Sequence, residues 1–148
     1  MNKKYIFWLI LFFNCFIIYA TIQRNDYLIY NGVKYYIDEN PMEEYFLSYP
    51  SKRPKTNTIS SDLWRGYIAT FEIINNELWV TKIEIITRTN RNTGDHILRN
   101  VINRIFNGKN KIKVEWYSGL LGLSKSRYSN LNENYNIREP LKTKIFLP

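Results

Sequence analysis

Cysteine and histidine are almost absent from this sequence, which contains only Cys15 and His96. A disulfide framework needs paired cysteines, and a structural zinc site needs four Cys or His ligands, so the sequence excludes both. It also has no GxGxxG, GxxxxGKS/T or HExxH motif and no EF-hand loop. We therefore expect no nucleotide, zinc-protease or calcium site, and no cofactor.

Glycine and proline are few, with six and five residues, and there is no internal repeat. Apolar residues make up 45% of the chain, aromatic residues 16% and charged residues 23%. This balance is enough to bury a core and excludes the disordered, collagen-like and coiled-coil classes. We expect residues 21–148 to form a single domain, because a chain of this length rarely holds two independent cores.

A long hydrophobic run, Tyr5–Ala20, follows two lysines. As a helix it would reach only about 24 Å, short of the ~30 Å hydrocarbon core, which favours a cleaved signal peptide over a membrane span. Ala20 suits the residue before the cleavage site. The large Ile18 keeps an uncleaved membrane anchor open, with membrane contact through this run. Acylation of Cys15 is disfavoured by Asn14 directly before it.

Acidic residues are the minority among the charges, 13 against 21 basic ones, so the formal net charge is +8. Without Lys3 and Lys4 it is +6. The excess favours anionic surroundings such as lipid headgroups, an acidic envelope polymer or an acidic protein, through an attraction that salt screens. An exported protein is not expected to bind nucleic acid. The basic residues are dispersed, so an ordinary solvated surface is the alternative.

Two β-hairpins are predicted. The first joins Asp26–Tyr30 to Val33–Ile37 through Asn-Gly, a pair that tolerates the positive φ angles of a type I′ turn. The second joins Leu63–Ile74 to Glu77–Ile86 through Asn-Asn. Both faces of the second hairpin carry apolar residues, so we expect it to be covered on both sides.

A short helix is predicted from Pro41, which suits the first helical position, to Tyr49. Asn40 is expected to cap its start and Glu43 to complete a capping box. Pro50 follows and ends the helix, and a basic extended loop comes next.

A second, amphipathic helix is predicted from His96 to Asn107, packed on the sheet. Its apolar residues recur at helical spacing: Ile97, Leu98, Val101, Ile102, Ile105 and Phe106. Thr93 or Asp95 is expected to cap its start and Gly108 to end it.

Three further segments complete the expected fold. Lys111–Tyr117 alternates as a half-buried strand, Ser124–Asn136 is expected to be a long loop, and Thr143–Leu147 a closing strand. The sequence thus predicts an α+β fold with a mostly antiparallel sheet, built from two hairpins with one amphipathic helix on a face. A hydrophobic signal or anchor helix, residues 1–20, is expected before it.

The best candidate for ligand or partner contact is the segment around Trp64, Arg65 and Tyr67, together with Arg53 in the basic loop. Aromatic rings on a strand can stack on a ligand, and a guanidinium binds carboxylate or phosphate. The alternative, which we favour, is core and edge packing of the rings.

In that alternative, Gly66 marks a bulge and Arg65 pairs with Glu43 or Glu72. The same packing role is expected for Trp79 and Trp116.

No catalytic group is predicted. His96 follows Asp95 directly, and neighbours on a helix point about 100° apart, so the two are not expected to act as a pair. The carboxylates Glu43, Asp62 and Glu72 are candidates for hydrolysis only if the fold brings two of them across a cleft.

Several short motifs occur in a fixed order between about Tyr27 and Leu121: NPMEEYF, KRP, LWRGYIATFEI, LWVTKI and WYSG. In this order and spacing the chain resembles a family of small bacterial proteins with no established activity. The resemblance implies a bacterial source and assigns no functional residue. The Asn-rich stretch from Ser124 departs from the family pattern.

The leading functional expectation is an exported or membrane-tethered, non-enzymatic binding module, whose partner is a protein or an anionic envelope polymer. One alternative is an immunity-type protein that neutralises a toxin by direct contact. Another is a hydrolase of cell-envelope polymers.

Overall fold

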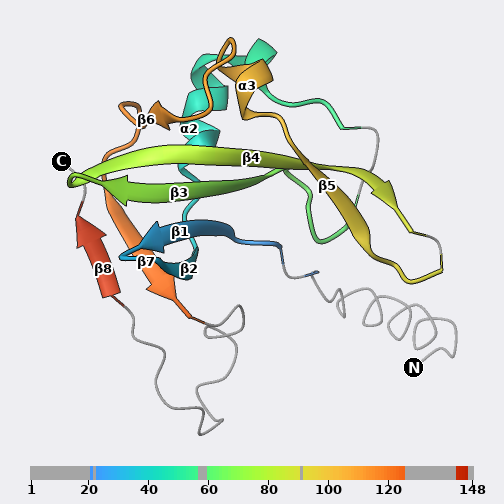
Figure 1. The fold of residues 1–148 in the computed structure, drawn as a ribbon, viewed down its shortest axis with the longest axis horizontal. Coiled ribbons are helices and arrows are strands. Elements are labelled where there is room, and N and C mark those ends of the chain that lie inside the picture. Colours follow the sequence, from blue (N-terminus) through green and yellow to red (C-terminus); the bar gives the residue numbers. More distant parts are fainter. Residues whose placement is uncertain (1–20, 22, 57–59, 91, 126–142, 147–148) are drawn as a thin grey trace, which may run out of the picture.

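The computed structural model describes residues 21, 23–56, 60–90, 92–125 and 143–146 (Figure 1). The expected signal or anchor helix and nearly all of the expected Asn-rich loop lie outside these residues. Within them, one eight-stranded sheet has the order β5-β4-β3-β1-β2-β7-β8, with β6 also paired to β4. The prediction of a sheet-dominated α+β fold is confirmed.

Both predicted hairpins are present. β1 (Asp26–Tyr30) pairs with β2 (Val33–Ile37), and Asn31 and Gly32 have φ angles of 50° and 74°, as a type I′ turn needs. β3 (Ile68–Ile74) pairs with β4 (Glu77–Thr89). β3 begins later than predicted, because residues 60–66 form turns instead. β1 also pairs in parallel with β3, so the two hairpins form one sheet.

The predicted amphipathic helix over residues 96–107 is wrong. β5 (His96–Asn100) is a strand paired with β4, and only α3 (Ile102–Ile105) is helical. The physical reason is the length of β4, whose edge opposite β3 would otherwise leave the backbone groups of residues 84–89 without a strand partner. β5 satisfies those backbone groups.

The loop before β5 is therefore a hairpin turn and not a helix cap. Asn90 donates its backbone N–H to the Asp95 carbonyl at 2.8 Å, and Gly94 donates to the Asn90 carbonyl at 2.8 Å. Thr93 accepts from the Asp95 backbone through its hydroxyl oxygen at 3.3 Å.

The first helix is confirmed as α2 (Pro41–Ser48), followed by the 3₁₀ turn η1 (Pro50–Lys52). The predicted caps are wrong, because Asn40 makes no side-chain capping bond and the Glu43 carboxylate accepts from Arg53 instead. α2 and α3 lie on the same side of the sheet, and the rings of Tyr45 and Phe106 are 5.0 Å apart (Figure 1).

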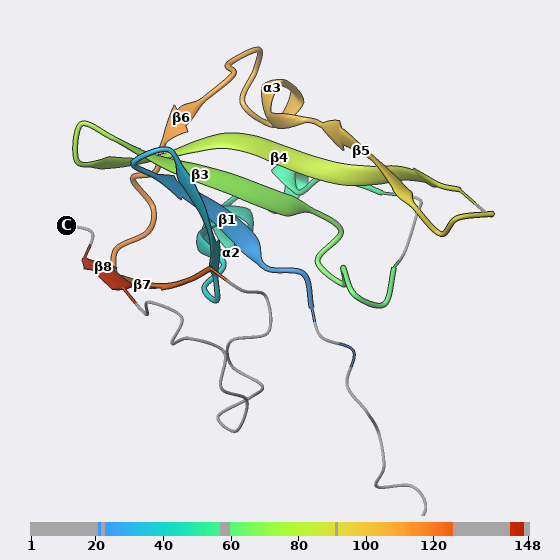
Figure 2. The ribbon, with the colours of Figure 1, turned by 60° about the horizontal axis from the view of Figure 1, so that its bottom comes forward.

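The core has two unequal parts. The larger one lies between the sheet and the helices α2 and α3, and includes Phe46, Phe71 and Ile105. Figure 2 shows α2 behind β1 and β3. A smaller cluster of Leu63, Ile68 and Ile86 belongs to the other side. The expectation that the second hairpin is covered on both faces is thus met in part.

The C-terminal strands close the sheet. β6 (Ile112–Lys113) is much shorter than the predicted strand Lys111–Tyr117. β7 (Leu120–Ser124) pairs with β2, and β8 (Thr143–Phe146) pairs with β7, which confirms the predicted last strand.

Candidate functional site

In the segment Ser60–Gly66, here called the Trp64 turn, two neighbouring side chains differ sharply in exposure. Leu63 is buried, whereas Trp64 is 82% exposed. The Leu63 N–H donates to the Ser60 carbonyl at 3.0 Å, and the Gly66 N–H donates to the Leu63 carbonyl at 2.9 Å. Gly66 has a φ of 81°, a conformation that favours glycine. The expected bulge at Gly66 is therefore a turn.

An ion pair lies beneath this turn. Arg65 donates to both carboxylate oxygens of Asp26, at 3.1 and 3.2 Å. Asp26 is fully buried and also accepts the Ala69 backbone N–H at 2.8 Å. Arg65 further donates to the Arg24 carbonyl at 2.7 Å and to the side-chain oxygen of Asn40. The guanidinium thus ties the start of β1 to the start of α2.

Burial dominates the acidity of Asp26. Removal from water raises its pKa to about 6, although the Arg65 charge and the Ala69 hydrogen bond act in the opposite direction. An ionised carboxylate in this position depends on its partners, since a buried unpaired charge is costly.

A second ion pair continues the network. Arg53 donates to the two carboxylate oxygens of Glu43 at 3.2 and 2.6 Å, and the Tyr67 hydroxyl donates to Glu43 at 2.6 Å. The guanidinium carbon of Arg65 is 5.3 Å from the centre of the Tyr67 ring, and that of Arg53 is 6.0 Å away. The Tyr67 ring therefore connects the two ion pairs by cation–π contacts.

The pKa values of Glu43 and Tyr67 shift in opposite directions. Burial raises the pKa of Glu43, but hydrogen bonds from Arg53 and Tyr67 outweigh it and lower the pKa below its usual value. Burial, together with the nearby Asp26 charge, raises the pKa of Tyr67. Tyr67 therefore stays protonated and acts as a donor at neutral pH.

The structure brings three of the four predicted contact residues, Arg53, Arg65 and Tyr67, into this one network. Tyr67 is fully buried, so its predicted role as core packing is confirmed. Trp64 is exposed, so the packing interpretation is wrong for it. The predicted pairing of Arg65 with Glu43 or Glu72 is also wrong, because Arg65 pairs with Asp26.

Sequence reasoning missed Asp26. Its signal was an acidic first residue in an otherwise apolar and aromatic strand, a position where a charge needs a partner.

Trp79 and Trp116 were also expected to pack in the core, and Trp116 meets this expectation more fully than Trp79. Trp116 packs against the core and donates from its indole N–H to the Pro41 carbonyl at 2.9 Å. The indole nitrogen of Trp79 is buried and has no hydrogen-bond partner within the described part of the chain.

The other candidate catalytic groups lie in separate contacts. Asp62 pairs with Arg24 at 2.6 Å. His96 lies at the start of β5, with its Nδ1 atom 2.9 Å from the Thr89 hydroxyl. No group of three metal-ligating side chains of the Cys, His, Asp or Glu type occurs within the residues described above.

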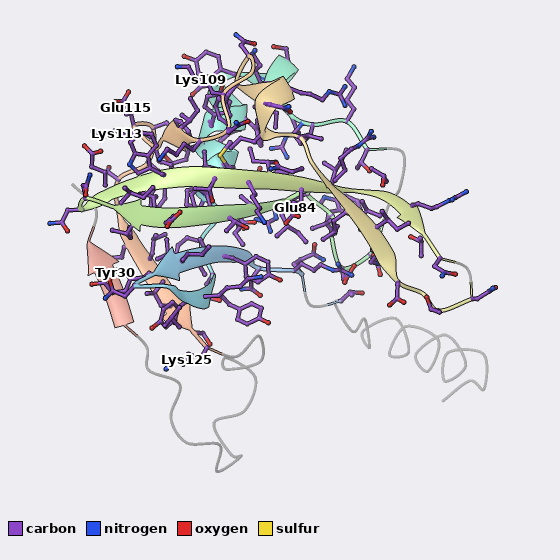
Figure 3. All side chains as sticks on the ribbon, in the orientation of Figure 1. Tyr30, Glu84, Lys109, Lys113, Glu115 and Lys125 are labelled. Carbon is purple, nitrogen blue, oxygen red and sulfur yellow. The ribbon has the colours of Figure 1, made fainter. Side chains whose placement is uncertain are left out.

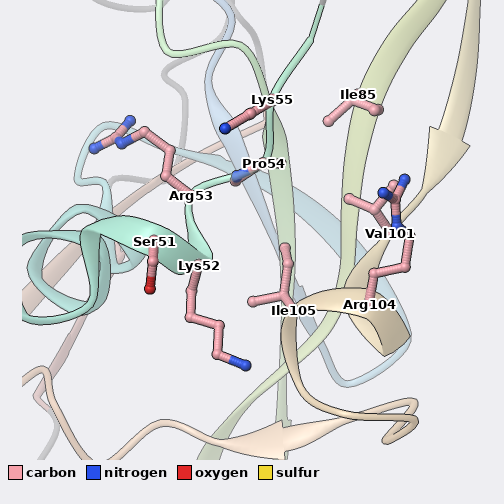
Figure 4. A pocket seen from close by; sticks show the side chains of 9 residues that line it. All are labelled: Ser51, Lys52, Arg53, Pro54, Lys55, Ile85, Val101, Arg104 and Ile105. Carbon is pink, nitrogen blue, oxygen red and sulfur yellow. The ribbon is translucent and has the colours of Figure 1, made fainter.

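A basic groove lies on the side of the sheet that carries α3. Figure 4 shows the segment Ser51–Lys55 on one side of it and side chains of β4, Val101 and α3 on the other. The groove has a volume of about 240 Å³. It is lined by Ser51, Lys52, Arg53, Pro54, Lys55, Ile85, Val101, Arg104 and Ile105. Four of these residues are basic and none is acidic.

The four basic side chains of the groove differ in their contacts. Arg53 is held by Glu43, and Lys52 donates to the side-chain oxygen of Asn107 at 3.1 Å. Lys55 and Arg104 are exposed and make no ion pair with the residues that the structure describes. Their charges are free to meet an anionic group.

A second, more open depression of about 520 Å³ lies beside Trp64. It is lined by Thr21, Gln23, Arg24, Asn25, Asp38, Asn40, Trp64 and Arg65. Both Trp64 and Arg65 of the predicted contact set line it, whereas Arg53 lines the basic groove.

Among the residues described, no helix is long and apolar enough to cross a membrane. In comparisons with known proteins, the chain matches no family model, no curated protein and no solved structure. The resemblance to a family of small bacterial proteins therefore stays a prediction.

Proposed function

We propose that this chain is an exported or membrane-tethered binding module that takes an acidic protein segment in the basic groove. The observation that carries the proposal is the lining of that groove, which combines four basic residues with an apolar floor and no acidic residue. Positive potential attracts an acidic partner over distance, and the floor accepts an apolar side chain.

The apolar floor distinguishes between the two kinds of partner expected for a basic protein, although its exposed surface is small. Ile85, Val101 and Ile105 are each at most 4% exposed, and only an apolar group would remove that remaining surface from water. An acidic peptide that carries an apolar residue fits both the rim and the floor. A toxin with such a segment would make the chain an immunity-type protein.

The ion-paired network supports a binding role over hydrolysis. Glu43 accepts from Arg53 and Tyr67, and Asp62 pairs with Arg24, so each of these carboxylates is already engaged within the protein. General acid or base catalysis needs a carboxyl group within reach of a substrate. These two carboxylates instead stabilise the fold.

The test uses two labelled peptides, in which glutamates flank a central phenylalanine or a central serine, and the polymer polyglycerol phosphate. We expect the phenylalanine peptide to bind most tightly by fluorescence anisotropy, and its affinity to fall as salt rises. Replacing Lys55 and Arg104 by alanine should weaken binding about tenfold, as the loss of two exposed charges would.

The control removes the same charge outside the groove, through Lys82→Ala and Lys125→Ala. Both control residues are exposed, and Lys125 lies far from α3 (Figure 3). Equal weakening by the two double variants would mean that only the net charge matters, and the groove would lose its role. Tightest binding of the polymer would replace the protein partner by an envelope polymer.

A further inference from the structure

Trp64 is the most exposed large apolar side chain among the residues that the structure describes. Its place is fixed by its surroundings, because its backbone N–H donates to the side-chain oxygen of Gln23 at 2.9 Å. The neighbouring Leu63 is buried and anchors the turn in the smaller core cluster. The indole ring is therefore presented to the outside by a fixed turn.

The same turn holds the first residues after the hydrophobic run. Gln23 donates from its side chain to the Ser61 carbonyl at 2.8 Å. Arg24 donates its backbone N–H to the Asp62 carbonyl at 2.7 Å, and its side chain pairs with Asp62 at 2.6 Å. The chain is thus fastened to the Trp64 turn from Gln23 onwards.

This fastening leaves a very short connection. Ala20, the last residue of the hydrophobic run, is three residues before Gln23. Three residues span at most about 10 Å when fully extended. In a chain that keeps the run in a bilayer, Gln23 consequently lies within about 10 Å of the membrane surface. The Trp64 turn is hydrogen-bonded to Gln23 and lies directly beside it.

We propose that the Trp64 turn is a membrane-interface contact, in which Trp64 enters the headgroup region of the bilayer that holds Tyr5–Ala20. Tryptophan favours this region because its ring is apolar and its N–H can still meet a polar partner. The depression beside it is lined by polar side chains of Gln23, Asn25 and Asn40, which suit contact with headgroups.

The contact sets the orientation of the domain. Lys109, in the loop between α3 and β6, lies on the opposite side of the molecule from the end of β1 that leads to Thr21 (Figure 3). The α3 side of the molecule, with the basic groove, would then face away from the bilayer. The inference rests on the membrane-tethered form of the proposed function, but it uses none of the groove residues, so its failure would leave the proposed binding in the groove standing.

The experiment uses the full chain, synthesised without cells in the presence of phosphatidylethanolamine–phosphatidylglycerol vesicles, so that no peptidase removes residues 1–20. Cys15→Ala provides a cysteine-free background. An environment-sensitive dye is then attached at Ser61→Cys in the Trp64 turn, or at Lys109→Cys as the control. Both sites are exposed. Emission and quenching by headgroup-labelled lipids are measured on chains that float with the vesicles.

We expect the dye at residue 61 to shift to shorter wavelengths and to be quenched, and the dye at residue 109 to behave as in water. Trp64→Ser should reduce the shift and the quenching at residue 61. Absence of flotation, equal signals at the two sites, or no effect of Trp64→Ser would each overturn the proposal.

Discussion

At the scale of single residues, the centre of the molecule depends on two arginines that each satisfy a carboxylate. Arg65 neutralises the buried Asp26, and Arg53 neutralises Glu43. The sequence indicated that Arg65 was important, but its partner is 39 residues away, and no local pattern identifies such a pair. Spacing along a strand predicts which face a residue occupies and not which distant residue it meets.

The pH dependence of stability should reveal Asp26. Because its pKa is raised to about 6 in the folded protein, the folded state binds a proton that the unfolded state lacks between about pH 6 and 4. This group therefore adds stability as the pH falls through that window. Asp26→Asn cannot take up the proton.

The variant should be less stable than the wild type, and the gap in unfolding free energy should widen by about 1 kcal/mol from about pH 7 to pH 5. Urea denaturation at both pH values measures it. A gap that narrows toward the lower pH would show that the pKa of Asp26 is not raised.

Glu43 should behave in the opposite way. Its pKa is lowered in the folded protein, so its contribution to stability is present above its ordinary pKa and is lost as the pH falls through the lowered value. Glu43→Gln should cost about 2 kcal/mol at neutral pH, the usual loss for a charged hydrogen-bonded group. Acid titration should show the two proteins converging, and a constant difference down to strongly acidic pH would contradict this.

At the scale of elements, the hairpin turns could be predicted from local sequence, whereas the pairing of distant strands could not. Asn31-Gly32 and Asn75-Asn76 adopt the positive φ angles that their hairpins need, so both hairpins were predictable. Apolar residues recur at helical spacing from Ile97 to Phe106, yet residues 96–100 form a strand on the edge of β4 opposite β3. Helical spacing in a short segment is a weak signal when a strand edge lies next to it.

The strand assignment of β5 makes a clear prediction. Ile97 is 53% exposed, whereas Ile105 is 4% exposed. An amphipathic helix would bury both. We expect Ile97→Ala to change the unfolding free energy by less than about 1 kcal/mol, and Ile105→Ala to lower it by about 3 kcal/mol. Thermal and urea denaturation of the two variants measure this. Similar large losses of unfolding free energy for both would favour the amphipathic helix over the strand.

At the scale of the whole molecule, β1 is the element that unites the fold. It lies between β2 and β3, so the residues that follow the hydrophobic run enter the middle of the sheet. The two edges of the sheet are β5 and β8. The C-terminal strand β8 covers β7, whose Leu121 and Leu123 belong to the main core.

Deleting Thr143–Pro148 should therefore expose the edge of β7. We expect a loss of about 2 kcal/mol of unfolding free energy from the missing backbone hydrogen bonds. We also expect association that grows with protein concentration, because a free strand edge over an apolar core pairs with other chains. Light scattering during size-exclusion chromatography over a concentration series measures it. Deleting only Leu147 and Pro148, beyond β8, is the matched control and should leave both properties unchanged. If the variant that lacks Thr143–Pro148 stayed monomeric and equally stable, β8 would contribute nothing to stability or to covering the edge of β7.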